Sequence, residues 1–159
     1  GHIYRGPYFL GGEVGHIPVS KNGLLWECGG KGCLERYVGN RAIALRAKKV
    51  FKKDMALEEL SALAVYGNKK AQKIWEEVGQ DIGVALAGVV NVFNPSTVVV
   101  GGGVAQAGDI LIRSIRCSLV RHAMKQLKGK IKVVKASLGE KAGVWGAALL
   151  AKERVEVGI

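Results

Sequence analysis

The sequence is poor in cysteine, with three among 159 residues. So sparse and odd a set excludes a small scaffold held together by disulfides. Long apolar runs are also missing, because the longest, residues 82–93, is interrupted by Asn91 and by glycines. It falls short of the ~20 apolar residues that a membrane span requires. No basic segment followed by an apolar one opens the chain, so we expect a cytoplasmic protein with no membrane partner.

Acidic residues are scarce as well, with 13 Asp and Glu against 24 Lys and Arg and a net charge of +11. Two stretches contain basic residues and no acid, residues 41–53 and 110–139. Such stretches fit either a surface for polyanions or solvated helix faces. In the second stretch, apolar residues recur at helical spacing: Ile112, Ile115, Leu119 and Ala123. No aromatic residue interleaves with the cations of the second stretch, so we interpret both stretches as helix faces and expect no direct nucleic-acid contact.

Apolar residues make up 48% of the chain, which excludes disorder and suits one domain over residues 1–159. Hydrophobic periodicity predicts an α/β chain. The expected strands are residues 2–5, 13–20, 24–27, 97–100 and 131–135. A hairpin turn is expected at Asn22-Gly23. The expected helices are residues 34–51, 56–66, 69–93, 109–127 and 141–154.

The long predicted helix over residues 69–93 carries glycines in its interior, and each costs about 1 kcal/mol relative to alanine. Gly79 and Gly83 lie one turn apart on one face, a spacing that permits the close approach of another backbone. The β-branched run at residues 97–100 is typical of a strand buried on both faces.

Two motifs near the start of the chain could carry chemistry. Glu13 and His16 stand three residues apart between glycines, where a carboxylate and an imidazole can bind hydroxyls or tune a proton transfer. Taken alone, this spacing fits a surface glutamate and a histidine with satisfied hydrogen bonds better. Cys28 and Cys33 enclose three glycines, so the chain can wrap tightly enough for two thiolates to face one zinc ion, with His16 as a third ligand. A pair of reduced structural thiols explains the spacing of the two cysteines equally well.

A third motif is the glycine run Gly101, Gly102 and Gly103, directly after the β-branched strand. Glycines at the carboxyl end of a strand let a ligand approach the backbone, in the crevice where α/β sheets bind nucleotides. The sequence has no Walker A motif and no G-x-G-x-x-G fingerprint, which removes the two commonest nucleotide-binding motifs.

Taken in order, these motifs resemble the C-terminal half of the ROK family of sugar kinases and sugar-responsive repressors. Residues 13–16 match its E-x-G-H element, and residues 26–35 match C-x-C-G-x-x-G-C-x-E at every fixed position but the first. Residues 94–95 and 98–104 are similar to the family's adenosine-side segment, and residues 142–148 to its closing helix.

The resemblance implies an actin-like ATPase (ribonuclease H-like) fold, with a small hairpin and zinc loop. It implies phosphorylation of a hexose, most commonly glucose, by ATP with Mg²⁺, and a homo-oligomer such as a dimer. Sugar hydroxyls would be bound by Glu13, His16 and Glu35, and the adenosine side of the nucleotide site would be formed by the three glycines.

The family also places three cysteines and the same histidine around a structural zinc. His16, Cys28 and Cys33 match three of these ligands, but Trp26 stands at the first cysteine position. Structural zinc sites are normally closed by four ligands, so we expect zinc to be weakly held or absent.

The family's general-base Asp lies in its N-terminal half, which this chain does not resemble. We therefore expect the chain to be the C-terminal domain of a longer sugar kinase, without a catalytic residue of its own and inactive in isolation. The alternative is the sugar-sensing domain of a ROK repressor, which shares all of these motifs. A winged helix-turn-helix encoded upstream would distinguish the repressor.

Overall fold

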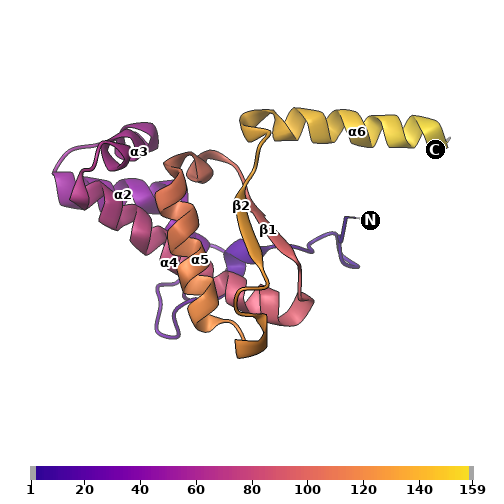
Figure 1. Cartoon of the computed structure of the whole chain (residues 1–159), viewed down its shortest axis with the longest axis horizontal. Coiled ribbons are helices and arrows are strands. Elements are labelled where there is room, and N and C mark those ends of the chain that lie inside the picture. Colours follow the sequence, from indigo (N-terminus) through magenta and orange to yellow (C-terminus); the bar gives the residue numbers. More distant parts are fainter. Residues whose placement is uncertain (1–2, 158–159) are drawn as a thin grey trace.

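The computed structural model describes residues 3–157. Helices α1 to α5 form a helical body, and a two-stranded sheet connects this body to a last helix that stands apart from it (Figure 1). The α-helices are α1 (Glu35–Val38), α2 (Asn40–Phe51), α3 (Leu57–Val65), α4 (Lys69–Phe93), α5 (Asp109–His122) and α6 (Ala142–Val157). The strands are β1 (Thr97–Val100) and β2 (Lys132–Lys135), and short 3-10 helices include η1 (Val14–His16) and η2 (Gly103–Ala107).

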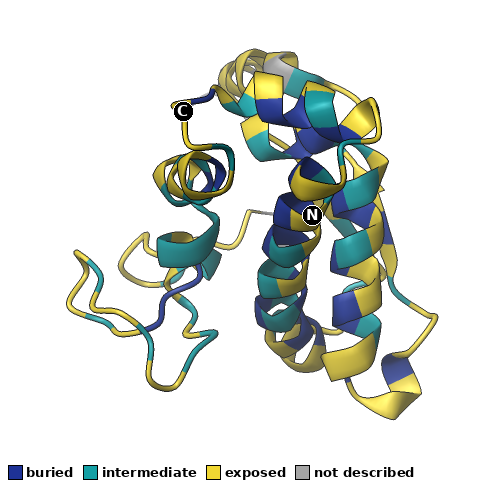
Figure 2. Ribbon diagram, turned by 90° about the vertical axis from the view of Figure 1, so that its left-hand side faces the viewer, coloured by how far each residue is buried: buried dark blue, intermediate teal, exposed yellow. Residues whose placement is uncertain are grey.

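Helix α4 has the bounds that the sequence predicts, and local signals explain both ends. The Asn68 side chain accepts hydrogen bonds from the backbone N–H groups of Lys70 and Ala71, at 3.0 and 3.1 Å. The helix ends at Phe93, because the next residue, Asn94, adopts a left-handed conformation (φ 46°) before Pro95. Its buried face includes Trp75, and Figure 2 shows buried residues along the two long helices.

Helices α4 and α5 approach closely along a seam of small residues, which confirms the expectation for Gly79 and Gly83. A Cβ atom added to Gly79 would lie 2.6 Å from Ser114 Cβ, and one added to Gly83 would lie 2.8 Å from the Ile115 carbonyl oxygen. Ser114 and Ser118 of α5 donate hydrogen bonds to backbone carbonyls of α4, at 2.6 and 2.8 Å. The close packing offsets the low helix propensity of the glycines.

Strands β1 and β2 pair in parallel, with Thr97 opposite Lys132 and Val100 opposite Lys135. Both strands were located by the sequence to within one residue, but the prediction that residues 97–100 are buried on both faces is wrong. Val99 is 61% exposed, whereas Val133 is buried beneath the helical body. Within residues 3–157 the sheet has only these two strands. The paired residues Val99 and Val134 are both exposed, so the face that carries them is uncovered.

The predicted hairpin near the start of the chain is also wrong, as far as the described residues show. No regular strand forms over residues 3–27, and part of the predicted strand 13–20 is the 3-10 helix η1. Isolated bridges join Pro18 to Cys33 and Leu25 to Lys31. Both arms of the turn at residues 20–23 therefore pair with the cysteine loop instead of with each other, because the loop folds back between them.

Two predicted helices differ from the structure at their ends. The helix expected over residues 34–51 is broken at Gly39, whose backbone is extended (ψ 154°) and separates α1 from α2. The helix expected over residues 109–127 ends at His122, because Ala123 is extended and the Met124 N–H donates to the Asn91 side chain instead, at 2.9 Å.

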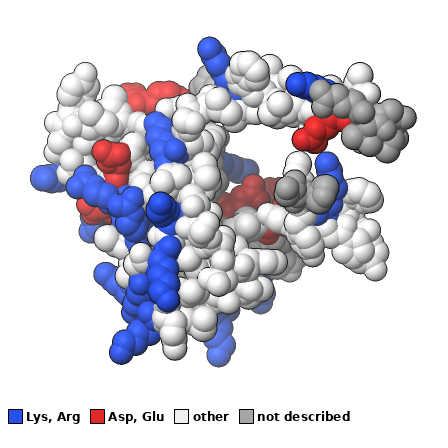
Figure 3. Space-filling view, turned by 45° about the vertical axis from the view of Figure 1, so that its right-hand side comes forward, with Lys and Arg blue, Asp and Glu red and all other residues white. Residues whose placement is uncertain are grey.

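The cations of residues 41–49 lie on α2, as predicted. In the second stretch the prediction holds only for the cations of α5, because that helix ends at His122 and Lys132 and Lys135 belong to β2. Ile112, Ile115 and Leu119 point into the core, while Arg113 and Arg121 are exposed. Figure 3 shows Lys and Arg side chains gathered over one face of the helical body, with few acidic side chains among them. Within the described residues, no helix combines the length and apolar character needed to cross a bilayer.

Candidate functional site

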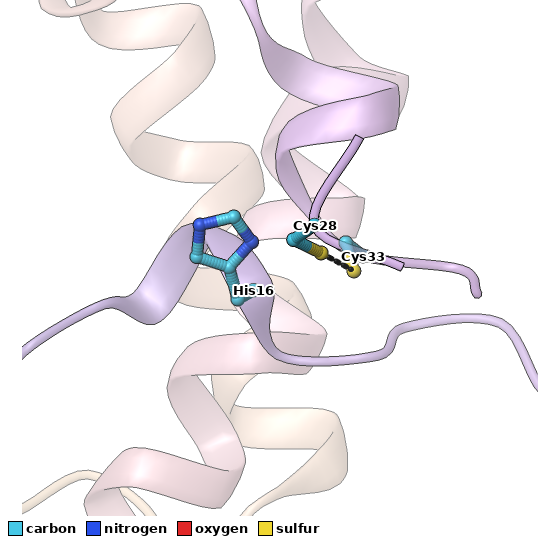
Figure 4. A group of neighbouring side chains, drawn as sticks. All are labelled: His16, Cys28 and Cys33. Atoms are coloured by element: carbon cyan, nitrogen blue, oxygen red, sulfur yellow. Dashed lines mark hydrogen bonds between the residues drawn. The ribbon is translucent and has the colours of Figure 1, made fainter. Parts of the chain in front are cut away.

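Three side chains that can ligate a metal converge near the start of the chain. His16 comes from η1, and Cys28 and Cys33 come from the following loop (Figure 4). One ligand atom from each residue lies within 4.8 Å of the other two, and the sulfur atoms are 3.5 Å apart. In Figure 4 the His16 Nδ1 atom faces Cys28, while Nε2 points away from the sulfurs. The structure thus brings together the three residues that the sequence predicts as metal ligands.

Glycine makes the tight path of the cysteine loop possible. A Cβ atom added to Gly30 would lie 3.0 Å from the Cys33 sulfur and 3.3 Å from the Cys28 sulfur. Gly32 has a positive φ of 73° and lies against the backbone of Ser20. The ends of the loop are fixed by backbone hydrogen bonds, including Trp26 N–H to the Gly30 carbonyl at 2.8 Å. The two thiols therefore face each other as a consequence of the backbone path.

The two thiols differ in their surroundings. Cys28 is exposed, whereas Cys33 is buried with 2% of its surface accessible. Burial is the largest cause that raises the pKa of the Cys33 thiol above 9.0, and the neighbouring Cys28 raises it further. A divalent cation between the sulfurs would reverse this effect, because it stabilises both thiolates.

One imidazole and two thiols suit zinc, but they supply three ligands rather than the four of a closed structural site. Trp26 has no ligand atom to offer. Its half-buried indole lies beneath the Arg36 guanidinium, whose carbon is 5.6 Å from the ring centre. The sequence did not predict this contact between Arg36 and Trp26, because nothing in the spacing of the two residues indicates it. The residues present therefore fit a three-ligand metal site with an open fourth position.

The predicted sugar-binding residues lie beside this cluster. Glu13 Oε2 is 3.9 Å from His16 Nε2, on the ring nitrogen that points away from the sulfurs. A Cβ atom added to Gly15 would lie 3.4 Å from Glu35 Cβ and 3.6 Å from Glu35 Oε2. The Glu35 side chain thus packs against the backbone between Glu13 and His16. Two exposed carboxylates and one imidazole form a single group of hydrogen-bonding side chains.

A cleft of about 380 Å³ opens next to Glu35. It lies between the cysteine loop and the start of α2, and its lining includes Trp26, Glu27, Arg36 and Asn40. The sequence analysis did not anticipate this cleft, because the loop and α2 are brought together by the break at Gly39.

The glycine run lies on a different element from these side chains. Gly101, Gly102 and Gly103 follow β1 and lead into η2. A Cβ atom on Gly101 would lie 3.3 Å from Ala136 Cβ, and Gly102 has a positive φ of 78°. All three are exposed at the carboxyl end of β1, so their backbone is open to a ligand.

Comparison with known proteins identifies relatives of two kinds. The model of the ROK family matches residues 1–154. A glucokinase of Thermotoga maritima is 32% identical across 98% of this chain and 53% of the relative. The DNA-binding transcriptional dual regulator NagC of Escherichia coli is 30% identical across 100% of this chain and 42% of the relative. The chain spans about half the length of these relatives, or somewhat less.

The solved structures that resemble this chain likewise include both a glucokinase and a transcriptional regulator. A ROK family glucokinase from Streptomyces griseus, in complex with glucose and AMPPNP, has a TM-score of 0.85 and 32% identity, covering 94% of this chain and 54% of that protein. A ROK family transcriptional regulator homologous to the Escherichia coli MLC protein has a TM-score of 0.75 and 27% identity, covering 83% of this chain and 36% of that protein. The fold of this chain is therefore that of the corresponding part of the ROK glucokinases, whose actin-like ATPase fold the motifs predicted. The chain belongs to the ROK family.

Proposed function

We propose that this chain is the C-terminal part of an ATP-dependent hexose kinase of the glucokinase type, with glucose as its substrate. The observation that carries the proposal is the group formed by Glu13, His16 and Glu35. In this proposal the two carboxylates accept hydrogen bonds from neighbouring sugar hydroxyls, and His16 Nε2 makes a third contact. Hydrogen bonds to charged groups contribute about 1.5–3 kcal/mol each, which is enough to select and orient a hexose.

His16 also links the sugar group to the cysteine loop. A metal ion on Nδ1 would fix the tautomer of the ring and so present Nε2 as an oriented hydrogen-bond donor. His16, Cys28 and Cys33 would hold this ion.

The remaining parts of the proposal concern ATP and assembly. Gly101, Gly102 and Gly103 would receive the adenosine side of ATP, bound with Mg²⁺, because their exposed backbone admits close approach. We further propose that the protein works in the cytoplasm as a homo-oligomer and makes no nucleic-acid contact through this chain.

The test is the glucose affinity of the full-length gene product carrying Glu35→Gln. The substitution keeps the shape of the side chain but removes its charge, so we expect glucose binding to weaken by about 1.5–3 kcal/mol. The matched control is Glu27→Gln, because Glu27 is exposed in the adjacent cleft and lies outside the proposed group. Unchanged glucose affinity and turnover in Glu35→Gln would remove Glu35 from the site.

A sugar-sensing domain of a ROK repressor is the second candidate, favoured by the similarity to NagC. A kinase must bind ATP together with the sugar, whereas a sensor needs the sugar alone. Calorimetric titration of the full-length protein with AMPPNP in the presence of glucose separates the two, since only the kinase should release heat. A winged helix-turn-helix encoded upstream of residue 1 would also favour the repressor.

A further inference from the structure

Cys28 and Cys33 form a pair whose geometry suits a second kind of chemistry, independent of the proposed function. Their sulfur atoms are 3.5 Å apart, and a disulfide requires about 2.05 Å. Closing this gap needs a combined movement of about 1.5 Å, shared between two side chains. Cys28 is the exposed residue of the pair and so the one that can meet a small oxidant, and the sulfur of the buried Cys33 lies 3.5 Å from its own.

The loop holds the sulfurs together without help from a ligand. Bridges at Pro18–Cys33 and Leu25–Lys31 fix both of its ends. At Gly30 the absent side chain leaves room for both sulfurs, since a Cβ atom there would lie within 3.3 Å of each. The missing fourth ligand at Trp26 means that a metal would secure these sulfurs less firmly than in a closed site. The two thiols are therefore held close together by the loop, and a bound metal would protect them only incompletely from oxidation.

We propose that Cys28 and Cys33 are a redox dithiol, which a peroxide converts to a disulfide, and that metal binding and oxidation compete for the same two sulfurs. The Cys28 thiol is oxidised by hydrogen peroxide to a sulfenic acid, and one water is released. The Cys33 sulfur then attacks the Cys28 sulfur, the S–O bond breaks, and a second water carries away the hydroxyl group and the remaining thiol proton. The dithiol loses two electrons, and the peroxide is reduced to two waters.

Competition with the metal follows from the ligand set. A disulfide removes both sulfur ligands and leaves His16 alone, so oxidation releases the metal. A bound metal in turn occupies the lone pairs that attack the oxidant. At a free zinc concentration ten times the dissociation constant, about one chain in eleven is metal-free, and oxidation should slow about tenfold.

The experiment treats the reduced, metal-free chain with one equivalent of hydrogen peroxide and then digests it with trypsin. Trypsin cuts after Lys31, which lies between the two cysteines. The disulfide should therefore appear as peptide 22–31 linked to peptide 32–36, a species that a thiol reductant separates. A thiol titration in denaturant should fall from three thiols to one, because Cys117 remains free.

Two variants and a parallel measurement on the zinc-loaded chain complete the experiment. Cys117→Ser should still give the linked peptides, whereas Cys28→Ser should not. A chain loaded with zinc should lose its thiols about tenfold more slowly and release zinc to a chromogenic chelator as it does so. Oxidation to sulfinic acid without linked peptides, or loss of the Cys117 thiol first, would overturn the dithiol. A chain that binds no zinc, or that oxidises equally fast with zinc bound, would overturn the competition.

Discussion

Trp26 decides what kind of metal site this loop can form. It stands where the ROK motif has its first zinc cysteine, and its ring instead lies beneath the Arg36 guanidinium at 5.6 Å. Such a cation–π contact contributes about 0.5–1 kcal/mol at an exposed site. A structural zinc site contributes about 10–16 kcal/mol in small zinc-finger peptides. The indole contact therefore supplies only a small part of the stabilisation that a closed zinc site would give.

Restoring the cysteine should convert the open site into a closed one. We expect the wild-type chain to lose zinc on dialysis against a mild chelator, because three ligands leave a coordination position open to exchange. Trp26→Cys should keep one zinc per chain through the same dialysis, measured by atomic absorption.

The control for this substitution is Trp26→Ser, which removes the indole without supplying a thiol. It should lose zinc as the wild-type chain does. If the wild-type chain already retains one zinc per chain, a fourth ligand must come from another residue, and the open site would be wrong.

Among the elements, the α4–α5 seam shows most directly how sequence determines packing. Gly79 and Gly83 allow two helical backbones to come close enough for Ser114 and Ser118 to donate to carbonyl groups of α4. Gly88 lies on the same helix, but a Cβ atom there would meet nothing within 4 Å. The three glycines therefore have the same propensity cost and different packing roles.

Because of this difference, we expect alanine to have opposite effects on stability at Gly83 and at Gly88. Gly83→Ala should destabilise the fold by about 1–3 kcal/mol, because its Cβ would lie 2.8 Å from the Ile115 carbonyl oxygen. Gly88→Ala should stabilise it by about 0.5–1 kcal/mol through helix propensity alone. Urea unfolding followed by circular dichroism at 222 nm measures both. Equal stabilisation by the two alanines would contradict the close approach of α5 to Gly83.

The elements that the sequence predicted well are those whose signals are local. Helix α4 carries its own cap at Asn68 and its own stop at Asn94-Pro95, and β1 is a four-residue β-branched run. The predicted strand 13–20 failed because its alternation was a local signal without a partner strand. The structure pairs this region with the cysteine loop instead, through contacts that no local pattern encodes.

The candidate site was predicted in part for the same reason. The spacing of Cys28 and Cys33 and the position of His16 are local, and they identified the metal-ligand cluster that the structure brings together. The approach of Glu35 to Gly15 joins residues twenty positions apart. It was expected only through the resemblance to the ROK family. Neither the local spacing nor the resemblance to the ROK family predicts the contact between Trp26 and Arg36.

At the scale of the whole molecule, the chain leaves apolar surfaces uncovered. Val99 on the open face of the sheet is 61% exposed, and Trp145 and Leu149 of α6 are 55% and 57% exposed. Apolar surfaces of this kind mark interfaces more often than free surface. The chain also spans about half the length of its glucokinase relatives. In the proposed hexose kinase, we expect these faces to pack against the other half of the protein.

The described residues also offer no aspartate placed to act on a bound sugar. Phosphoryl transfer to a sugar needs a base that takes the proton of the attacking hydroxyl. Asp81 forms an ion pair with Arg46 at 2.9 Å, and Asp54 forms one with Lys48 at 3.0 Å. Asp109 lies in the first turn of α5. None of the three belongs to η1, the cysteine loop or α1, which carry the proposed sugar contacts.

The isolated chain of 159 residues should therefore show no measurable sugar kinase activity and at best weak hexose binding. In the proposed kinase this chain supplies only part of the site, so glucose and ATP each lose the contacts that the other half of the protein would make, in addition to the base. A coupled assay with glucose, ATP and Mg²⁺ measures this directly. Turnover should appear when the N-terminal half of the Thermotoga maritima glucokinase is fused in front of the chain, because that relative is 32% identical across 98% of the chain. Robust turnover by the chain alone, lost in Glu13→Gln or Glu35→Gln, would place a catalytic base within these residues and overturn the prediction.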